Sequence, residues 1–286
     1  MKGIWAAALT PVGEDLAPDS VRAVPYYRRL LERGCDGINL LGTTGEAMSF
    51  SAGQRATFME SVASSDLPKN QMIAATGGAS LDDAVRLTKT AFECGFAAAL
   101  IMPPFFFREA TDDGIVAFFE ALATRTAPPR GGILLYNFPR MSGVAFHAGL
   151  VDRLLGEFPG IIGGVKDSSN DAALQSDIIG RHPDLRVFPG SERDLLAAKA
   201  RGAAGCISGS VALWPELARQ AWTSGEATLA DELTRRRAAL DGLPFIPAVR
   251  RLTADFCGEA EWERAMPPNV PLTPKERRLL AQRISR

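Results

Sequence analysis

The stretch Gly160-Ile161-Ile162-Gly163-Gly164-Val165-Lys166-Asp167-Ser168-Ser169 is a short apolar run that ends in a lysine and a polar turn. A run of this length, preceded by Pro159, is typical of a buried β-strand. Lys166 at its carboxyl end would hold an amine in a low-dielectric pocket, where burial disfavours the charged form. A neutral amine attacks carbonyls and forms Schiff bases. A lysine that ends a strand and points to solvent is the commoner case, so the rest of the chain must decide.

Short apolar runs of this kind alternate with longer amphipathic segments along the chain. The predicted strands cover residues 4–9, 37–41, 72–76, 97–102, 132–136, 161–166, 186–188 and 205–208. The predicted helices between them include residues 20–33, 51–65, 81–93, 112–125 and 194–201. Residues suited to cap helix starts are Asp19, Ser51, Ser80, Thr111 and Ser191, and several helices end at glycine.

Alternation of strands and helices implies parallel strands with right-handed crossovers. Eight such units predict a closed (β/α)8 TIM barrel. A doubly wound open sheet is less consistent, because Thr10-Pro11-Val12-Gly13 after the first strand lacks the glycine-rich phosphate-binding pattern. Three further helices, at 227–240, 245–256 and 274–284, follow without intervening strands. We therefore predict a barrel over residues 1–225 and a C-terminal helical subdomain over residues 226–286.

Composition excludes several classes of function. The 286 residues are 46% hydrophobic and carry a net charge of −1 with acids and bases interspersed, which argues against a nucleic-acid or membrane surface. No apolar stretch is long enough to span a membrane, and the N-terminus lacks a signal-peptide layout. The chain has two histidines and four widely spaced cysteines, so neither a metal site nor another cofactor is expected. Buried reduced thiols in a cytoplasmic protein are the expectation.

Polar residues recur at the carboxyl ends of the predicted strands, where barrel enzymes carry their chemistry. These segments are Gly42-Thr43-Thr44-Gly45-Glu46, Tyr136-Asn137-Phe138-Pro139, Lys166, Pro189-Gly190-Ser191 and Ile207-Ser208-Gly209. Each alone could be a turn, a helix cap or a core residue. Together they offer what imine chemistry needs, namely a phenol to pass protons, hydroxyls and backbone N–H groups to bind a carboxylate, and glycines that admit a small ligand.

The same motifs resemble the dihydrodipicolinate synthase / N-acetylneuraminate lyase family of class I aldolases. The resemblance runs from Ala8-Leu9-Thr10-Pro11 to Gly205-Cys206-Ile207-Ser208 and covers essentially the whole barrel. It implies that Lys166 forms a Schiff base with pyruvate or a pyruvoyl-type 2-oxo acid, without a separate cofactor. It also implies a homotetramer, usually a dimer of tight dimers.

The resemblance further implies roles for the residues around the lysine. Tyr136 would be the proton-transferring phenol, and Thr44 would shuttle protons with it. The Gly42-Thr43-Thr44 turn would hold the pyruvoyl carboxylate. Gly190 and Ile207 would supply backbone contacts.

Two positions depart from the synthase branch of the family. That branch donates a tyrosine across the tight dimer from the loop after the fourth strand, where this chain has Phe106 between two further phenylalanines. Phenylalanine can pack a dimer contact but cannot relay protons. The synthase branch also places an arginine where this chain has Met141, and Arg140 stands one position earlier. Arg140 could still reach the second substrate, but the run Pro139-Arg140-Met141-Ser142-Gly143 looks more like the sugar-acid lyase branches.

These observations favour a Schiff-base aldolase or lyase acting on pyruvate or a 2-oxo sugar acid with an aldehyde co-substrate. One alternative is dihydrodipicolinate synthase, which condenses pyruvate with aspartate semialdehyde. Another is a non-catalytic 2-oxo-acid-binding protein, suggested by the missing second phenol. A phosphate-sugar enzyme is disfavoured because Glu192 would repel phosphate. His147 is interpreted as a helix cap or surface residue.

Overall fold

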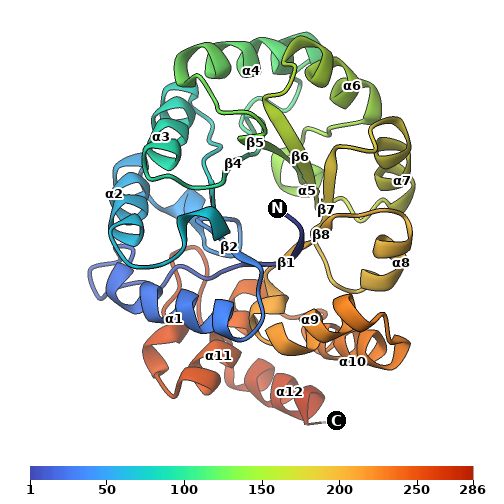
Figure 1. Cartoon of the computed structure of the whole chain (residues 1–286). Helices are drawn as coiled ribbons and strands as arrows, with labels where there is room; N and C mark the ends of the chain where they lie inside the picture. Colours follow the sequence, from blue (N-terminus) through green and yellow to red (C-terminus); the bar gives the residue numbers. More distant parts are fainter. Residues whose placement is uncertain (286) are drawn as a thin grey trace.

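The computed structural model of the chain describes residues 1–285 and contains one eight-stranded parallel sheet with the order β7-β6-β5-β4-β3-β2-β1-β8. The strands stand at the centre and the helices surround them (Figure 1). The strands are β1 (Gly3–Ala7), β2 (Gly37–Leu40), β3 (Met72–Ala75), β4 (Ala98–Ile101), β5 (Ile133–Asn137), β6 (Ile162–Asp167), β7 (Arg186–Pro189) and β8 (Gly205–Ser208).

The two outer strands of this sheet approach each other and nearly close it into a barrel. The Ala204 amide, just before β8, donates to the Val187 carbonyl of β7 at 2.9 Å. Every predicted strand is present and its ends differ from the prediction by at most two residues. The predicted (β/α)8 barrel is therefore confirmed.

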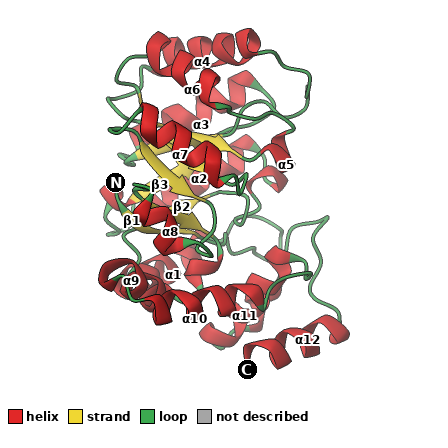
Figure 2. Cartoon of the chain, turned by 90° about the vertical axis from the view of Figure 1, so that its right-hand side faces the viewer, coloured by secondary structure: helices red, strands yellow, loops and turns green. Residues whose placement is uncertain are grey.

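Helices connect the strands and cover their outer faces. They are α1 (Ser20–Glu32), α2 (Ala52–Ala63), α3 (Leu81–Glu93), α4 (Asp112–Thr126), α5 (Pro139–Ser142), α6 (Ala148–Glu157), α7 (Ala172–Arg181), α8 (Leu195–Ala200) and α9 (Pro215–Ser224). Short 3-10 helices are η1 (Ala47–Ser49), η2 (Lys69–Gln71), η3 (Ser210–Ala212) and η4 (Ala260–Glu263). Figure 2 shows α5 at the end of the barrel opposite the N-terminus, as expected where the strands terminate.

Most of the predicted helix caps are confirmed. The side chains of Asp19, Ser51, Ser80 and Thr111 accept backbone N–H groups of the helices that follow them. His147 likewise caps α6. The predicted cap at Ser191 is wrong, because α8 begins at Leu195. The chain between these two residues instead turns so that the Glu192 side chain is buried.

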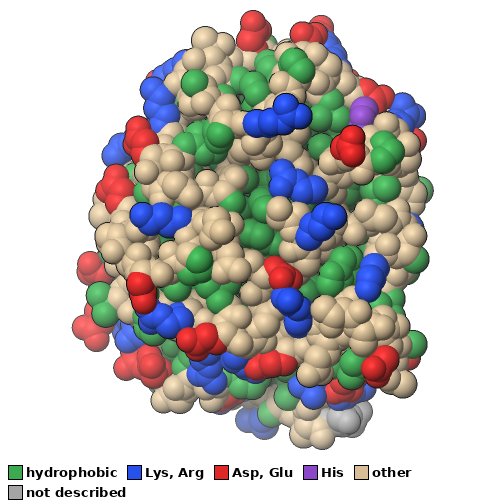
Figure 3. Space-filling view, in the orientation of Figure 1, with side chains coloured by type: hydrophobic (Ala, Val, Ile, Leu, Met, Phe, Trp, Pro, Cys, Tyr) green, Lys and Arg blue, Asp and Glu red, His purple; other side chains and the backbone are tan. Residues whose placement is uncertain are grey.

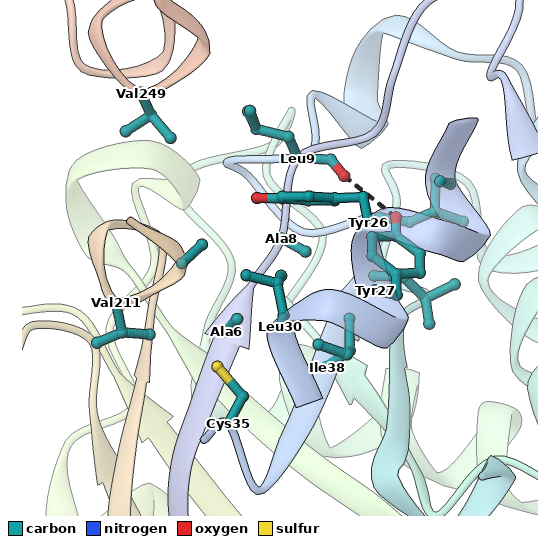
Figure 4. Close-up of a cluster of buried hydrophobic side chains, with 14 of the residues drawn as sticks. Ala6, Ala8, Leu9, Tyr26, Tyr27, Leu30, Cys35, Ile38, Val211 and Val249 are labelled. Atoms are coloured by element: carbon teal, nitrogen blue, oxygen red, sulfur yellow. Dashed lines mark hydrogen bonds between the residues drawn. The ribbon is translucent and has the colours of Figure 1, made fainter. Parts of the chain in front are cut away.

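After α9 the chain continues as α10 (Ala227–Ala238), α11 (Phe245–Cys257) and α12 (Pro274–Ile284), close to the predicted bounds. These C-terminal helices share one buried cluster with the barrel, in which Val249 and Trp262 join Tyr27 and Leu30 of α1. Figure 4 shows part of this cluster, in which the Tyr27 hydroxyl donates to the Leu9 carbonyl at 3.1 Å. The division into units at residues 225 and 226 stays a prediction, because the apolar core runs across it.

The described residues bear on three other predictions. None of the helices within 1–285 is long and apolar enough to cross a membrane. Acidic and basic side chains both occur on the face that carries the N-terminus (Figure 3). All four cysteines are unpaired, but burial of the thiols is only partly confirmed, since Cys35 and Cys206 are buried whereas Cys94 and Cys257 are half-buried. The last two lie at or near helix ends, where the core does not cover them fully.

Candidate active site

A buried lysine and a buried tyrosine form the centre of the candidate site. Lys166 of β6 and Tyr136 of β5 are each 3% exposed and are paired in the register of the two strands. Tyr136 belongs to the cluster inside the barrel, with Phe188 and Ile207. The Lys166 Nζ atom lies 4.3 Å from the centre of the Tyr136 ring. An amine and a phenol are therefore neighbours at the carboxyl ends of adjacent strands.

The turn after β2 brings hydroxyl groups to the same place. Thr43 Oγ1 and the Tyr136 hydroxyl are 3.1 Å apart, which is hydrogen-bond distance. The turn is closed by the Glu46 amide, which donates to the Thr43 carbonyl at 3.0 Å, and by the Ala47 amide, which donates to the Gly42 carbonyl at 3.3 Å. The residues of this turn, 42–47, are called the threonine turn below.

Thr44 of the threonine turn and Ile207 of β8 lie where the ends of β2 and β8 come together. Thr44 is buried against the chain that follows β8, because a Cβ atom added to Gly209 would lie 2.5 Å from Thr44 Oγ1. Ile207 lies within β8 and is fully buried inside the barrel. The β2 and β8 strand ends therefore meet at Thr44.

Gly190 lies directly after β7 at a position with no room for a side chain. A Cβ atom there would come 2.1 Å from Ser168 Oγ and 2.9 Å from Ser168 Cβ. The Gly190 amide donates to the Asp167 carbonyl at 2.7 Å, which holds this close approach of the segments after β6 and β7.

A hydrogen-bond network on the outer side of β5 and β6 fixes the two strand ends. Asn137 Nδ2 and Gln175 Nε2 each donate to the Asp167 carboxylate at 2.7 Å. Asn137 Oδ1 accepts the Phe146 amide at 3.0 Å. Since successive side chains of a strand point to opposite faces, this network holds Tyr136 and Lys166 facing inward.

Glu192 and Ser208, of the segments that follow β7 and end β8, are bonded to each other beside these groups. Glu192 is fully buried, and its Oε2 accepts a hydrogen bond from Ser208 Oγ at 2.6 Å. Its Oε1 is buried without a hydrogen-bond partner in the structure. The pKa of the buried Cys206 thiol is raised first by burial and then by the Glu192 carboxylate, while Lys166 opposes the shift, so both groups act on one position of β8. An acid two residues after a strand-end glycine was the available signal.

Two predicted residues lie apart from this cluster in the single chain. Phe106 is 74% exposed in the loop after β4, and Arg140 is exposed in α5. Neither side chain makes a hydrogen bond or ring contact to Lys166, Tyr136 or Thr43 among the contacts of residues 1–285. A role for either residue therefore needs a bound substrate or a second chain.

A TIM barrel with a buried lysine beside a phenol and a hydroxyl at its strand ends is the arrangement of a class I aldolase, which works through an amine rather than a metal. Comparison with known proteins agrees. Residues 1–285 match the model of the dihydrodipicolinate synthetase family. The chain belongs to this family and is a lyase of the class I aldolase type.

Several relatives cover most of the chain. It is 36% identical over 219 residues to a protein described as an uncharacterized DapA-like lyase of Chloroflexus aurantiacus, covering 76% of this chain and 73% of the relative. It is 33% identical to an N-acetylneuraminate lyase of Rhizobium meliloti, covering 72% of this chain and 67% of that one. A crystal structure of dihydrodipicolinate synthase from Agrobacterium tumefaciens has 30% identity, covers 100% of this chain and 99% of its own, and superimposes with a TM-score of 0.93.

The close approach of Gly190 to Ser168 leads to a testable prediction. The change Gly190→Ala should destabilise the protein by about 1–3 kcal/mol and lower activity, because the new methyl group displaces Ser168. Thermal unfolding and steady-state kinetics measure both effects. Combining Gly190→Ala with Ser168→Gly removes the opposing side chain and should recover part of the loss. If Gly190→Ala alone left the unfolding temperature and the activity unchanged, the close approach of Gly190 to Ser168 would be contradicted.

Proposed function

We propose that Lys166 is the Schiff-base lysine for pyruvate or a pyruvoyl-type 2-oxo acid. The observation that carries the proposal is the buried Lys166 amine 4.3 Å from the Tyr136 ring, with the Tyr136 hydroxyl 3.1 Å from Thr43 Oγ1. The amine adds to the C2 carbonyl to give a carbinolamine, which loses water to form an imine. Loss of a C3 proton from this imine gives an enamine, which attacks an aldehyde. The reverse sequence cleaves the carbon–carbon bond.

Tyr136 is the group proposed to move protons in these steps. The carbinolamine hydroxyl must gain a proton before water leaves, and a phenol beside the amine can donate it. The hydrogen bond to Thr43 orients the phenol and can return a proton to it. Thr44, which packs against the chain after β8, is proposed to relay protons with Tyr136, and the backbone of the threonine turn can bind the carboxylate. The backbone at Gly190 and Ile207 is proposed to supply further contacts to the 2-oxo acid, as the family resemblance implies.

The first experiment is borohydride reduction in the presence of pyruvate. We expect a stable pyruvyl adduct on intact protein, which peptide mapping places on Lys166, because borohydride reduces imines to amines. Lys166→Ala should abolish the adduct and lower kcat by about a thousandfold or more. Tyr136→Phe keeps the ring that packs beside Lys166 and should slow adduct formation about a hundredfold.

Two results would contradict this proposal. Full activity of Lys166→Ala would exclude the mechanism. Saturable pyruvate binding by the unmodified protein without any trapped adduct would favour the alternative of a non-catalytic 2-oxo-acid-binding protein.

We infer further that the aldehyde partner is a neutral hydroxylated aldehyde, so that the substrate of cleavage is a sugar acid. Glu192 supports this choice, because its buried and unpartnered Oε1 can accept a hydrogen bond from a hydroxyl group but would repel a carboxylate. The relative named N-acetylneuraminate lyase acts on a sugar acid according to its name. Phe106 and Met141 support the same choice, since both stand where the synthase branch is expected to use polar side chains.

Dihydrodipicolinate synthase is the second candidate, supported by the Agrobacterium neighbour and by a 4-hydroxy-tetrahydrodipicolinate synthase of Persephonella marina at 31% identity. Arg140 would then have to bind the carboxylate of aspartate semialdehyde.

A panel of aldehydes with pyruvate separates the two candidates. We expect product with hydroxylated aldehydes and none with aspartate semialdehyde, measured by chromatography and a coupled reductase assay. Glu192→Gln should raise KM for the hydroxylated aldehyde about tenfold and leave KM for pyruvate nearly unchanged. Efficient turnover of aspartate semialdehyde that is lost in Arg140→Ala would establish the synthase instead.

We also propose that the protein is a homotetramer built as a dimer of dimers. Phe106 and Phe107 support this, because they are 74% and 76% exposed and pack edge to face with their ring centres 5.2 Å apart. Two adjacent phenylalanines exposed at a loop tip are unusual on a monomer surface and suit a partner chain. A second copy packing here would place its phenylalanines near the rim of the site.

Light scattering after gel filtration should give the mass of four chains. Phe106→Asp should shift the mass toward smaller species, because a carboxylate would be buried at the contact. Val21→Asp is a matched control on α1, since Val21 is 85% exposed, and it should leave the mass unchanged. A monomeric mass for the unmodified chain at all concentrations would overturn the proposal.

A further inference from the structure

Glu46 has an unusual backbone conformation for its residue type. Glu46 closes the threonine turn with a backbone φ of 53°. This angle lies in the left-handed region, which residues other than glycine rarely adopt. The residue is nevertheless a glutamate, and it is only 5% exposed. A buried charged residue in a strained conformation persists where its surroundings hold it there.

The surroundings of Glu46 come from the C-terminal part of the chain. Its Oε2 accepts from Arg250 Nε at 2.7 Å and also from Arg250 Nη2. Its Oε1 accepts from the Met266 amide at 3.0 Å and from Asn269 Nδ2 at 2.8 Å. Both carboxylate oxygens are therefore bonded to residues of the C-terminal part of the chain, beyond α10.

Arg250 of α11 connects this carboxylate to a third segment. Arg250 is fully buried, and besides Glu46 it binds the Thr10 carbonyl at 2.8 Å and the Trp262 carbonyl at 3.3 Å. Burial lowers the pKa of its guanidinium, while the Glu46 carboxylate acts in the opposite direction. The pair thus joins the segment after β1, the threonine turn and the C-terminal helices.

General energetics indicate what such a pair contributes. A buried ion pair adds little stability compared with apolar residues of the same volume, because desolvation offsets the attraction. Apolar residues would fill this space as well but could not fix the direction of the Glu46 backbone. That direction matters, since the Glu46 amide donates to the Thr43 carbonyl and Thr43 Oγ1 meets the Tyr136 hydroxyl.

We propose that Glu46 and Arg250 are positioning residues that hold Thr43 at hydrogen-bond distance from Tyr136. The C-terminal helices then set the geometry of proton transfer although they supply none of the reacting groups. This inference rests on the proposed roles of Lys166, Tyr136 and Thr43.

The test compares Arg250→Lys and Glu46→Gln with Arg55→Lys. Arg250→Lys keeps the charge but loses the forked contact, and Glu46→Gln keeps the shape but removes the charge. Arg55 is a matched control, because it is also a buried arginine that binds backbone carbonyls, those of Ala75 and Gly77, and it has no hydrogen bond to the threonine turn. All variants are assayed well below their unfolding temperatures, so that a smaller folded fraction cannot account for a change.

Two readouts distinguish positioning from a purely structural role. The first is kcat for exchange of the pyruvate methyl protons with D2O, which depends on enamine formation. The second is amide hydrogen exchange of residues 43–47. In both test variants we expect kcat to fall about tenfold or more and amide exchange in this segment to rise. Arg55→Lys should change neither by more than about twofold.

The outcomes separate this inference from the proposed function. If the unmodified enzyme exchanges methyl protons and the folded test variants do so equally fast, the positioning role is wrong while the Schiff-base mechanism stands. If only stability falls, with kcat and local amide exchange unchanged, the pair is structural. If the unmodified enzyme shows no methyl exchange, the proposed function fails and the positioning role fails with it.

Discussion

The geometry of the candidate site depends on the hydrogen bond that Asn137 Nδ2 donates to the Asp167 carboxylate at 2.7 Å. It joins the ends of β5 and β6 on the outer side of the sheet, so that Tyr136 and Lys166 both face the barrel interior. A shift of one residue in either strand would turn its side chain toward the surrounding helices. The register of two parallel strands therefore decides whether the amine and the phenol meet at all.

Placing polar groups in the interior of the barrel has an energetic cost. Lys166 and Glu192 are buried at the same rim, where unpaired charge is expensive. Hydrogen bonds offset part of this cost, such as the one that Ser208 Oγ donates to Glu192 Oε2. Glu192 Oε1 has no hydrogen-bond partner among the described residues, and in the proposed function a hydroxyl group of the aldehyde supplies one.

The two halves of the proposed reaction have different support in this chain. The 2-oxo-acid half has its amine, phenol and threonine turn joined by direct contacts in one chain. The groups proposed for the aldehyde half are Glu192, which is buried, and Phe106 and Arg140, which are exposed in the single chain. Variation in this half is consistent with a family whose named members include both lyases and synthases.

The sequence by itself determined the eight strands, most helix caps and the position of Lys166, Tyr136 and the threonine turn at strand ends. These features follow from periodicity and turn chemistry, which act over a few residues. Only the tertiary structure decided that Ser191 is not a cap, that Glu192 is buried, and that Glu46 meets Arg250 across 204 positions of sequence. Such contacts depend on how distant elements pack, and no local pattern encodes them.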